Sequence, residues 1–482
     1  MKIFFQENRF RLFVSLSNMN YRFIIASLLI ILSLSSCRKD LETSSDPSLQ
    51  LSFSNDTVFF DTVFTTIGTT TKRLKIYNRA KNAVNISKID LVEQTAFASY
   101  RLNVDGIAGN HLRDIEIPAN DSIFAFVEVT VNTNASNIPF IISDSIMFET
   151  NGNRQKVDVV AYGENANFYR DSVLTGNIRF TNDKPYVIFG GILIDTLSKL
   201  TIDPGCRIYL HKDAIILAKG TIEVNGTKND SVTFQGDRRE QQYYNEPGQW
   251  SGIQFLPGSV NNLINYACIK GSVFGVIAGT LPLYGITPEV KITNSIIKYS
   301  QVTGIFGIAA KLKSYNNLIF ACGQYGVFTQ FGGEYDFIHN TIALTNFDMN
   351  RDNPAVLFTD YVKANNVFVG NNLVLNFRNN IVTGTGDDEY YIDSKHTTPA
   401  QTSTEYNMLK TKQNWSNTNL RNLNPQFVDP SLSLINNYTE NYRLKSSSAL
   451  KSAAAYLNTP PEILSDADGV LRANPASMGC YE

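Results

Sequence analysis

The chain has 482 residues, a formal net charge of −2 at pH 7 and 11% aromatic residues. This length allows two or three domains, each large enough to bury a core. The near-neutral charge gives no electrostatic reason to expect nucleic-acid binding.

The amino terminus has the pattern of an exported lipoprotein. Phe23–Leu34 is a twelve-residue apolar run after Arg22, which is too short to span a bilayer but long enough for a signal-peptide core. Leu34–Cys37 (LSSC) resembles a bacterial lipobox, the signal for lipidation and for cleavage before the cysteine. The resemblance implies a signal peptide over residues 1–36, a lipid on Cys37, and a polar tether over residues 37–47.

A lipid on Cys37 would anchor the protein to a membrane rather than make it span one. Arg38–Glu42 resembles the charged signal that sends some Gram-negative lipoproteins to the cell surface. We therefore expect an outer-membrane protein that is displayed on the cell surface. A periplasmic orientation stays open, as does the choice of Met1 or Met19 as the first residue.

Residues 48–165 predict an antiparallel β-sandwich. Lys72–Tyr77, Ser122–Val129 and Val157–Tyr162 alternate polar and apolar residues and are bounded by turns rich in Asn, Gly and Asp. Asp56–Ile67 resembles part of the immunoglobulin-like (Ig-like) modules that precede β-helices in bacterial surface lipoproteins. This resemblance implies a spacer, with ligand binding as the alternative.

A short phrase recurs in the middle of the chain, within Val290–Ala343, and its asparagines are 22 and then 24 residues apart. The phrase occurs around Asn294, Asn316 and Asn340. A period in the twenties with strand-forming residues predicts a parallel β-helix, whose coils must stack to complete one another's hydrogen bonds. Asn tolerates the backbone conformation of a tight corner, and stacked Asn side chains can hydrogen-bond from coil to coil.

The flanking phrases carry a second resemblance. Lys199–Gly205 (KLTIDPG), Gly220–Gly226 (GTIEVNG) and Gln249–Ile253 (QWSGI) resemble phrases of right-handed, polysaccharide-lyase-like β-helix proteins. The ending, Asp466–Glu482, resembles a tail found on many bacterial β-helix proteins, and we expect it to cap the last open edge. The expected fold class is thus all-β: an Ig-like sandwich followed by a right-handed parallel β-helix over residues 166–482.

Four cysteines follow Cys37 without the spacing of a zinc site: Cys206, Cys268, Cys322 and Cys480. Cys268 and Cys322 fall where small apolar residues would fill coil interiors, so we expect them to be buried and free. Export to an oxidising compartment could instead oxidise a pair.

Two clusters are candidate ligand-binding sites. The first contains Asp387, Asp388, Glu389, Tyr390 and Tyr391. Acids beside tyrosines can coordinate calcium or stack on sugar rings. The alternative is a solvated loop kept soluble by its charge.

The second cluster joins Asp237–Glu240 (DRRE) to Tyr243, Tyr244 and Trp250. We interpret this segment as an insertion between coils. Tyr243 and Trp250 are its candidate ligand contacts. The alternative is a loop that packs its aromatic side chains on the β-helix.

The phrases that carry catalysis in hydrolases and lyases of this fold are absent, which favours a non-catalytic role. We expect a monomer that binds glycans or other surface polymers, with no cofactor except a calcium ion that the acidic cluster could hold. One alternative is a polysaccharide lyase or glycoside hydrolase acting on the same face. A further alternative is a structural or adhesion protein of the envelope.

Overall fold

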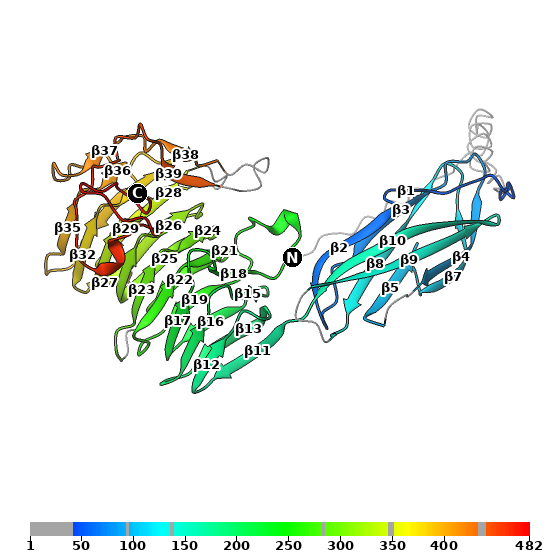
Figure 1. Ribbon diagram of the computed structural model, residues 1–482, viewed down its shortest axis with the longest axis horizontal. Helices are drawn as coiled ribbons and strands as arrows, with labels where there is room; N and C mark the ends of the chain where they lie inside the picture. Colours follow the sequence, from blue (N-terminus) through cyan, green and yellow to red (C-terminus); the bar gives the residue numbers. More distant parts are fainter. Residues whose placement is uncertain (1–41, 93–95, 135–138, 282–284, 346–350, 432–439) are drawn as a thin grey trace, which may run out of the picture. The chain divides into compact units, whose positions relative to one another are not determined.

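The computed structural model describes residues 42–92, 96–134, 139–281, 285–345, 351–431 and 440–482 (Figure 1). The described part of the chain is all-β and forms two compact units. The first comprises the described residues up to Phe59, Gly68–Val129 and Ser143–Val160, and the second comprises Phe60–Ile67, Thr130–Ile142 and Ala161–Glu482. The predicted signal peptide and Cys37 lie outside the described residues.

Two five-stranded sheets form from the first ten strands. Their orders are β1-β3-β8-β5-β6 and β2-β10-β9-β4-β7. The strands are β1 (Ser52–Phe53), β2 (Thr57–Phe64), β3 (Lys72–Tyr77), β4 (Val84–Val92), β5 (Ala98–Val104), β6 (Ile107–Ala108), β7 (His111–Ile117), β8 (Ser122–Val131), β9 (Phe140–Thr150) and β10 (Asn153–Glu164).

These two sheets face each other across a shared core. Their neighbouring strands run antiparallel, for example β3 with β8 and β4 with β9. The rings of Phe53 and Phe148, one from each sheet, lie 4.9 Å apart, and Tyr100 of one sheet donates a hydrogen bond to Asp144 of the other. Alternating burial along β8 explains the alternating sequence, because every second side chain points into this core.

A single sheet of 25 strands forms the solenoid, beginning at Asn167. Its first part contains β11 (Asn167–Leu174), β12 (Asn177–Phe180), β13 (Tyr186–Ile194), β14 (Lys199–Ile202), β15 (Arg207–Leu210), β16 (Ile215–Ala218), β17 (Thr221–Asn225), β18 (Val232–Gly236), β19 (Gly252–Phe255), β20 (Asn262–Asn265), β21 (Ala267–Lys270), β22 (Phe274–Ala278), β23 (Glu289–Thr293) and β24 (Ile296–Lys298). Its later strands are β25 (Thr303–Tyr315), β26 (Leu318–Phe320), β27 (Tyr325–Ile338), β28 (Thr341–Leu344), β29 (Val356–Thr359), β32 (Leu373–Arg378), β33 (Ile381–Gly384), β34 (Tyr390–Asp393), β35 (Gln401–Glu405), β36 (Met408–Leu409) and β37 (Leu420–Arg421).

Short elements lie outside this sheet. They are the antiparallel pairs β30 (Tyr361–Ala364) with β31 (Val367–Gly370) and β38 (Phe427–Asp429) with β39 (Asn441–Leu444), and the 3-10 turns η1 (Gln241–Tyr243) and η3 (Pro461–Ile463).

The solenoid strands pair in parallel with strands one coil away, which confirms the predicted parallel β-helix. In the regular coils each strand pairs with the third strand after it, as β14 does with β17 and β17 with β20. Each such coil therefore supplies three strands, and one apolar core runs through the stack, including Ile202, Val224, Ile264 and Ile292. Each coil completes the backbone hydrogen bonds of the next, so neither coil is stable alone.

The predicted asparagine ladder is present at one corner of the coils. In five successive steps, a backbone N–H donates to the Oδ1 of the Asn one coil further on, at 2.8–3.1 Å. The acceptors are Asn317, Asn340, Asn380, Asn407 and Asn419. All of these donors and acceptors are buried, so each of these hydrogen bonds replaces one that the same group makes to water in the unfolded chain.

The three repeated phrases stack in register, but the asparagines whose spacing indicated the repeat, Asn294, Asn316 and Asn340, belong to two neighbouring columns. Asn317, rather than Asn316, precedes Asn340 in the ladder. Asn294, Asn316 and His339 form a neighbouring column, and all three have positive φ, which is the left-handed conformation required at a tight corner.

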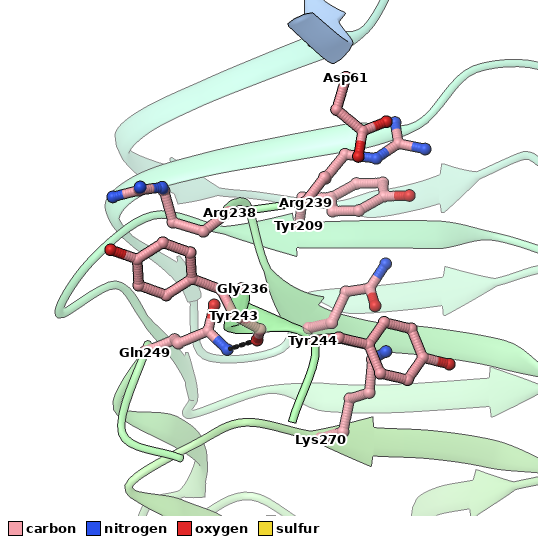
Figure 2. A pocket seen from close by; sticks show the side chains of 10 residues that line it. Asp61, Tyr209, Gly236, Arg238, Arg239, Tyr243, Tyr244, Gln249 and Lys270 are labelled. Carbon is pink, nitrogen blue, oxygen red and sulfur yellow. Dashed lines mark hydrogen bonds between the residues drawn. The ribbon is translucent and has the colours of Figure 1, made fainter. Parts of the chain in front are cut away.

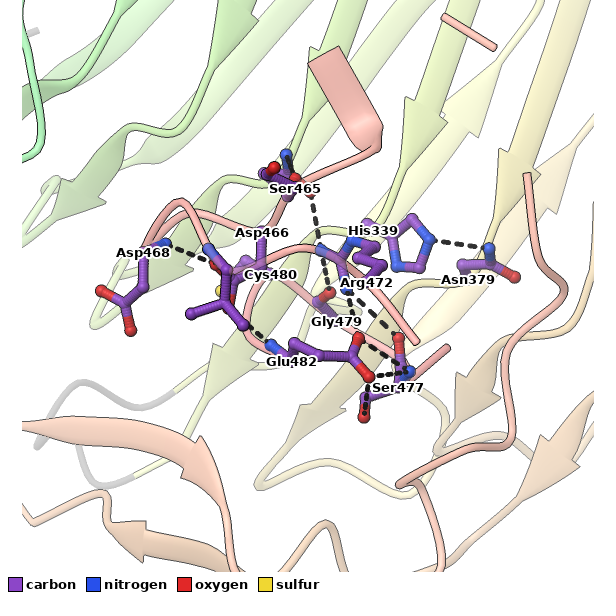
Figure 3. A network of polar contacts seen from close by, with 12 residues as sticks. His339, Asn379, Ser465, Asp466, Asp468, Arg472, Ser477, Gly479, Cys480 and Glu482 are labelled. Atoms are coloured by element: carbon purple, nitrogen blue, oxygen red, sulfur yellow. Dashed lines mark hydrogen bonds and ion pairs between the residues drawn. The ribbon is translucent and has the colours of Figure 1, made fainter. Parts of the chain in front are cut away.

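The C-terminal tail contacts the side of the stack, at Asn316, Thr341 and Asn379, through a polar network drawn in Figure 3. Buried Arg472 donates to Asn316 Oδ1 at 2.7 Å, Cys480 N donates to Thr341 at 3.1 Å and Gly479 N donates to the Asn379 carbonyl at 2.8 Å. Burial lowers the pKa of His339 beside this network, so its ring stays neutral. The tail therefore joins successive coils laterally.

Candidate functional site

The acidic cluster does not converge on a common point. Asp387 is exposed and pairs with Lys412 at 2.8 Å, whereas Asp388 accepts a hydrogen bond from Thr411 at 2.7 Å. Among the described residues, no group of three or more His, Cys, Asp or Glu side chains lies close enough to hold a metal ion. The arrangement offers no calcium cage.

Glu389 was wrongly expected to contact a ligand, because it is fully buried in an ion pair. Its carboxylate accepts hydrogen bonds from Nη2 and Nη1 of Arg351, at 2.5 and 2.7 Å, and from the backbone N–H of Ala355 at 2.8 Å. The side chains of the pair are 4% and 0% exposed. The ion pair links the loop that contains Arg351 to the loop that contains Glu389.

Two aromatic candidates are also buried and correct the prediction. Tyr390 is 0% exposed within the core and donates or accepts a hydrogen bond with Thr404 at 2.9 Å. Trp250 is 0% exposed, and its Nε1 donates to the Lys270 carbonyl at 2.9 Å. Tyr391 is 40% exposed on the outside of β34, so it remains accessible.

Cys322 is buried and free, as expected, whereas Cys268 is free but only half-buried. Cys268 lies between Ala267 and Ile269, both of which point into the core, so its own side chain points outward from β21. The other two cysteines, Cys206 and Cys480, are buried and free as well.

An outward-facing aromatic stack lies on β22, β25 and β27 but offers no platform for a ring. Phe306 and Phe328 have centroids 5.1 Å apart and an interplanar angle of 5°, and Phe274 and Tyr325 extend the stack. The rings stack on one another from coil to coil, so this column contributes to coil stacking.

A small pocket of about 210 Å³ lies in the second unit and collects most of the second sequence cluster (Figure 2). Its lining combines three cations, three tyrosines and two amides. The lining residues are Asp61, Tyr209, Gln235, Gly236, Arg238, Arg239, Tyr243, Tyr244, Gln249 and Lys270. Of the candidate ligand contacts from the sequence, Tyr243 lines this pocket.

The segment between β18 and β19 builds one wall of the pocket. It turns at η1, where Tyr243 N donates to the Glu240 carbonyl at 2.8 Å, and it returns to the coils where Gln249 N donates to the Gly271 carbonyl at 2.7 Å. This segment covers the outward-facing end of β21. The loop thus packs on the solenoid, and its Tyr243 and Tyr244 line the pocket.

Lys270 lies beneath this segment and is 7% exposed. Its Nζ is 3.6 Å from the centre of the Tyr244 ring. Burial lowers the pKa of Lys270 from 10.5 to about 8, and Lys298 adds to the lowering, whereas Cys268 and Glu440 oppose it. Lys270 and Lys298 are register partners in adjacent coils.

The three cations of the pocket differ in their partners. Arg238 Nη2 pairs with Glu240 at 2.9 Å, and Arg239 Nη1 pairs with Glu164 at 2.6 Å. Over the part of the chain that the structure describes, no carboxylate lies within ion-pair distance of Lys270. Lys270 is therefore the cation of this pocket that has no ion-pair partner among the described residues.

Gln249 brings an unsatisfied acceptor to the same pocket. Its Nε2 donates to the carbonyls of Tyr243 and Glu246, each at 2.8 Å, which fixes the orientation of the amide. Its Oε1 is buried and has no hydrogen-bond donor. A Cβ on Gly236 would lie 2.2 Å from this oxygen, so glycine is required there.

A larger hollow of about 790 Å³ lies near the last coils, and two of its polar side chains are held by partners within the solenoid. Lys410 Nζ donates to the Gly384 carbonyl at 2.7 Å, and the Asn422 side chain is bonded to the backbone of Thr411 at both ends. The smaller pocket is thus the better candidate site.

Lys270 and Gln249 were missed by the sequence analysis as functional residues. Lys270 ends a short strand, where an outward lysine is ordinarily solvated, and no motif surrounds it. The nearest signal was the charged and aromatic segment over residues 237–244, whose insertion between coils places it over a neighbouring strand.

Together these features define a protein with a β-sandwich unit and a parallel β-solenoid that carries a small cationic, tyrosine-lined pocket. No family model and no curated protein matches the chain. Within the described residues, no helix is long and apolar enough to cross a membrane.

Two solved structures are similar to part of the chain. One is a family 123 glycoside hydrolase from Clostridium perfringens, with a TM-score of 0.18 and 10% identity over 26% of this chain and 30% of that one. The other is a protein of unknown function from Porphyromonas gingivalis W83, with a TM-score of 0.17 and 13% identity over 26% of this chain and 60% of that one. At these scores neither similarity bears on function.

Proposed function

We propose that this chain is a lipid-anchored protein of the bacterial cell surface whose solenoid binds glycans without cleaving them. The anchor rests on Cys37 and the apolar run before it. The proposal includes an Ig-like character for the first unit and a right-handed solenoid, which is the usual hand of parallel crossover connections.

The pocket is the observation that carries the binding function. It places the rings of Tyr243 and Tyr244 beside polar side chains that include Lys270, which has no ion-pair partner among the described residues. A sugar ring offers an apolar C–H face to aromatic rings and hydroxyl groups to the polar ones. A concave site with a few convergent polar groups is the usual form of a ligand site.

The pocket does not support hydrolysis. Glycoside hydrolases of both stereochemical classes need two carboxyl groups on either side of the scissile bond. The described lining contains one carboxylate, Asp61, which lies beside Arg239 in Figure 2.

A lyase is the second candidate, and the lowered pKa of Lys270 favours it. A neutral lysine can accept the C5 proton of a uronate unit as the bond from C4 to the glycosidic oxygen breaks, leaving a C4–C5 double bond. The departing oxygen would take its proton from a nearby donor such as the Tyr244 hydroxyl. Ultraviolet absorbance of the unsaturated product distinguishes this reaction from binding.

The test of the proposed function is binding of the purified Cys37→Ser protein to a panel of neutral and acidic polysaccharides. We expect saturable binding to at least one polymer, weakened by Tyr244→Ala and unchanged by Tyr391→Ala, because Tyr391 lies outside the pocket. Absence of binding across the panel would contradict the proposal, and appearance of unsaturated product would replace binding by lyase activity.

A further inference from the structure

The lysine beneath the segment between β18 and β19 has the surroundings of a nucleophilic amine. We propose that Lys270 is a covalent capture site for a small aliphatic aldehyde, which its Nζ binds as an imine inside the pocket. The inference is independent of the proposed glycan binding, because it requires one amine and a carbonyl compound rather than a polysaccharide.

The position of Lys270 is fixed by hydrogen bonds at the end of its strand. Its carbonyl accepts from Trp250 Nε1 at 2.9 Å, and Gly271 N donates to the Lys298 carbonyl at 3.3 Å. Because side chains alternate along β21, Lys270 points outward from the core and into the pocket, where Figure 2 shows it reaching the Tyr244 ring. The amine is therefore held at the wall of a cavity.

The surroundings of Lys270 disfavour its charged form. The residue is 7% exposed, and its Nζ lies 3.6 Å from the centre of the Tyr244 ring. Its register partner in the next coil, Lys298, is a second cation, which has its own partner in Glu440 at 3.3 Å. Among the described residues, no carboxylate pairs with Lys270. A lysine that is desolvated beside another cationic group is an activated nucleophile.

The lowered pKa of Lys270 agrees with this geometry. Burial brings the pKa to about 8, and Lys298 adds to the lowering, whereas Cys268 and Glu440 oppose it. At pH 7 about one Lys270 amine in ten is then neutral, against roughly one in three thousand for a lysine whose pKa is 10.5.

The other charged groups of the pocket favour an uncharged ligand. Arg238 pairs with Glu240 at 2.9 Å, and Arg239 pairs with Glu164 at 2.6 Å. The lining carboxylate, Asp61, lies beside Arg239 in Figure 2. Because both arginines already hold carboxylates, the pocket does not need an anion to balance them.

The Tyr244 ring favours an imine over an acylated lysine. A protonated imine keeps the positive charge on nitrogen, so it retains the cation–π contact that the ammonium makes with this ring. An amide formed by acylation is neutral and would lose that contact. The volume of about 210 Å³ and the rings of Tyr243 and Tyr244 suit a short carbon chain.

The reaction needs no reagent besides the aldehyde. The lone pair of the neutral Nζ attacks the carbonyl carbon, a C–N bond forms, and the carbonyl oxygen takes up a proton to give a carbinolamine. The C–O bond then breaks, the hydroxyl group leaves as water with a second proton, and a C=N bond forms. Overall, one ammonium and one aldehyde give one protonated imine and one water, so atoms and charge balance.

The experiment compares Lys270 with a solvated lysine of the same chain. The full-length Cys37→Ser protein is incubated with butyraldehyde and cyanoborohydride, which reduces each imine to a stable secondary amine, and peptide mass spectrometry measures the rate of labelling at each lysine. Lys212 is exposed and lies outside the pocket lining, so it is the internal reference. Tyr244→Ala removes the covering ring, and Tyr391→Ala is the control outside the pocket. Circular dichroism verifies that both variants are folded.

We expect Lys270 to be labelled about 10-fold faster than Lys212 at pH 7, because its larger neutral fraction outweighs its lower basicity. The ratio should fall to about 1 at pH 10, where a substantial fraction of both amines is neutral. Labelling of Lys270 should saturate with butyraldehyde concentration, whereas labelling of Lys212 should rise linearly. Tyr244→Ala should lower the ratio at pH 7 about 10-fold, and Tyr391→Ala should leave it unchanged.

Three results would overturn the inference. Labelling of Lys270 that is no faster than that of Lys212 at pH 7 would show that the amine is not activated. A ratio that does not change between pH 7 and pH 10 would remove the neutral amine as the reason for the preference. Labelling that rises linearly at both lysines would show that the pocket does not bind the aldehyde. None of these results bears on polysaccharide binding, so the inference and the proposed function fail separately.

Discussion

Replacing Lys270 by Met should stabilise the unliganded protein, although it removes a buried side chain with close contacts. The reason is the charge. Lowering the pKa of Lys270 from 10.5 to about 8 corresponds to a folding penalty on the order of 3 kcal/mol at neutral pH. The cation–π contact with Tyr244 offsets about 1 kcal/mol of this penalty. Methionine fills a similar volume, so the expected net gain in unfolding free energy is about 2 kcal/mol.

The pH dependence has a definite sign. Because the folded pKa lies below the unfolded one, the unfolded chain binds more protons between about pH 8 and pH 10.5. The penalty is therefore fully present below pH 8 and disappears as the pH rises through this window. The stability difference between Lys270→Met and the parent protein should shrink over the same window.

The assay is urea unfolding at pH 7 and pH 10, with midpoints compared where the slopes agree. Lys298→Met is the matched control, because it removes the next lysine in the column and leaves the buried carboxylate of Glu440 without its ion-pair partner, with only the hydrogen bond from Tyr299. It should destabilise the protein. If Lys270→Met lowers the midpoint at pH 7 as Lys298→Met does, Lys270 is a structural residue and the reasoning fails.

Three further predictions concern the fold and the anchor. Asn340→Ala should lower the free energy of unfolding by about 3–5 kcal/mol, because it leaves the Asn317 N–H, the Ser314 hydroxyl and the Ser314 carbonyl without this hydrogen-bond partner. Differential scanning calorimetry measures this change, and a loss below about 1 kcal/mol would contradict a stabilising role of the ladder. Glu389→Ala should lower the free energy of unfolding by about 3–5 kcal/mol, because the buried charge of Arg351 loses its ion-pair partner. Unaltered hydrogen exchange in the two loops would count against this prediction. Cys37→Ser should release the protein from membranes in fractionated cells, and unchanged membrane association would rule out the lipid anchor.

The solenoid was predictable because its signal is repetitive. The phrases around Asn294 and Asn316 recur in step, and the corner chemistry of Asn requires no knowledge of distant residues. The spacing of the asparagines did not separate the two columns, because Asn316 and Asn317 are adjacent. Either can occupy a corner, and only the hydrogen bond from Asn317 N to Asn340 decides between the two columns.

The site was less predictable because its chemistry depends on partners far apart in the sequence. Glu389 belongs to a local acidic run, yet Arg351, 38 residues earlier, neutralises it. Trp250 lies in the segment that forms the pocket but points into the core. The pKa of Lys270 is lowered only when the segment containing Tyr244 folds over it, and no local sequence pattern predicts this contact.

A crystal structure of the protein soaked with an oligosaccharide selected from the binding panel tests the central claim most directly. We expect density for one sugar unit in the pocket, against the rings of Tyr243 and Tyr244. Density for the oligosaccharide elsewhere on the solenoid, with the pocket empty, would contradict the claim.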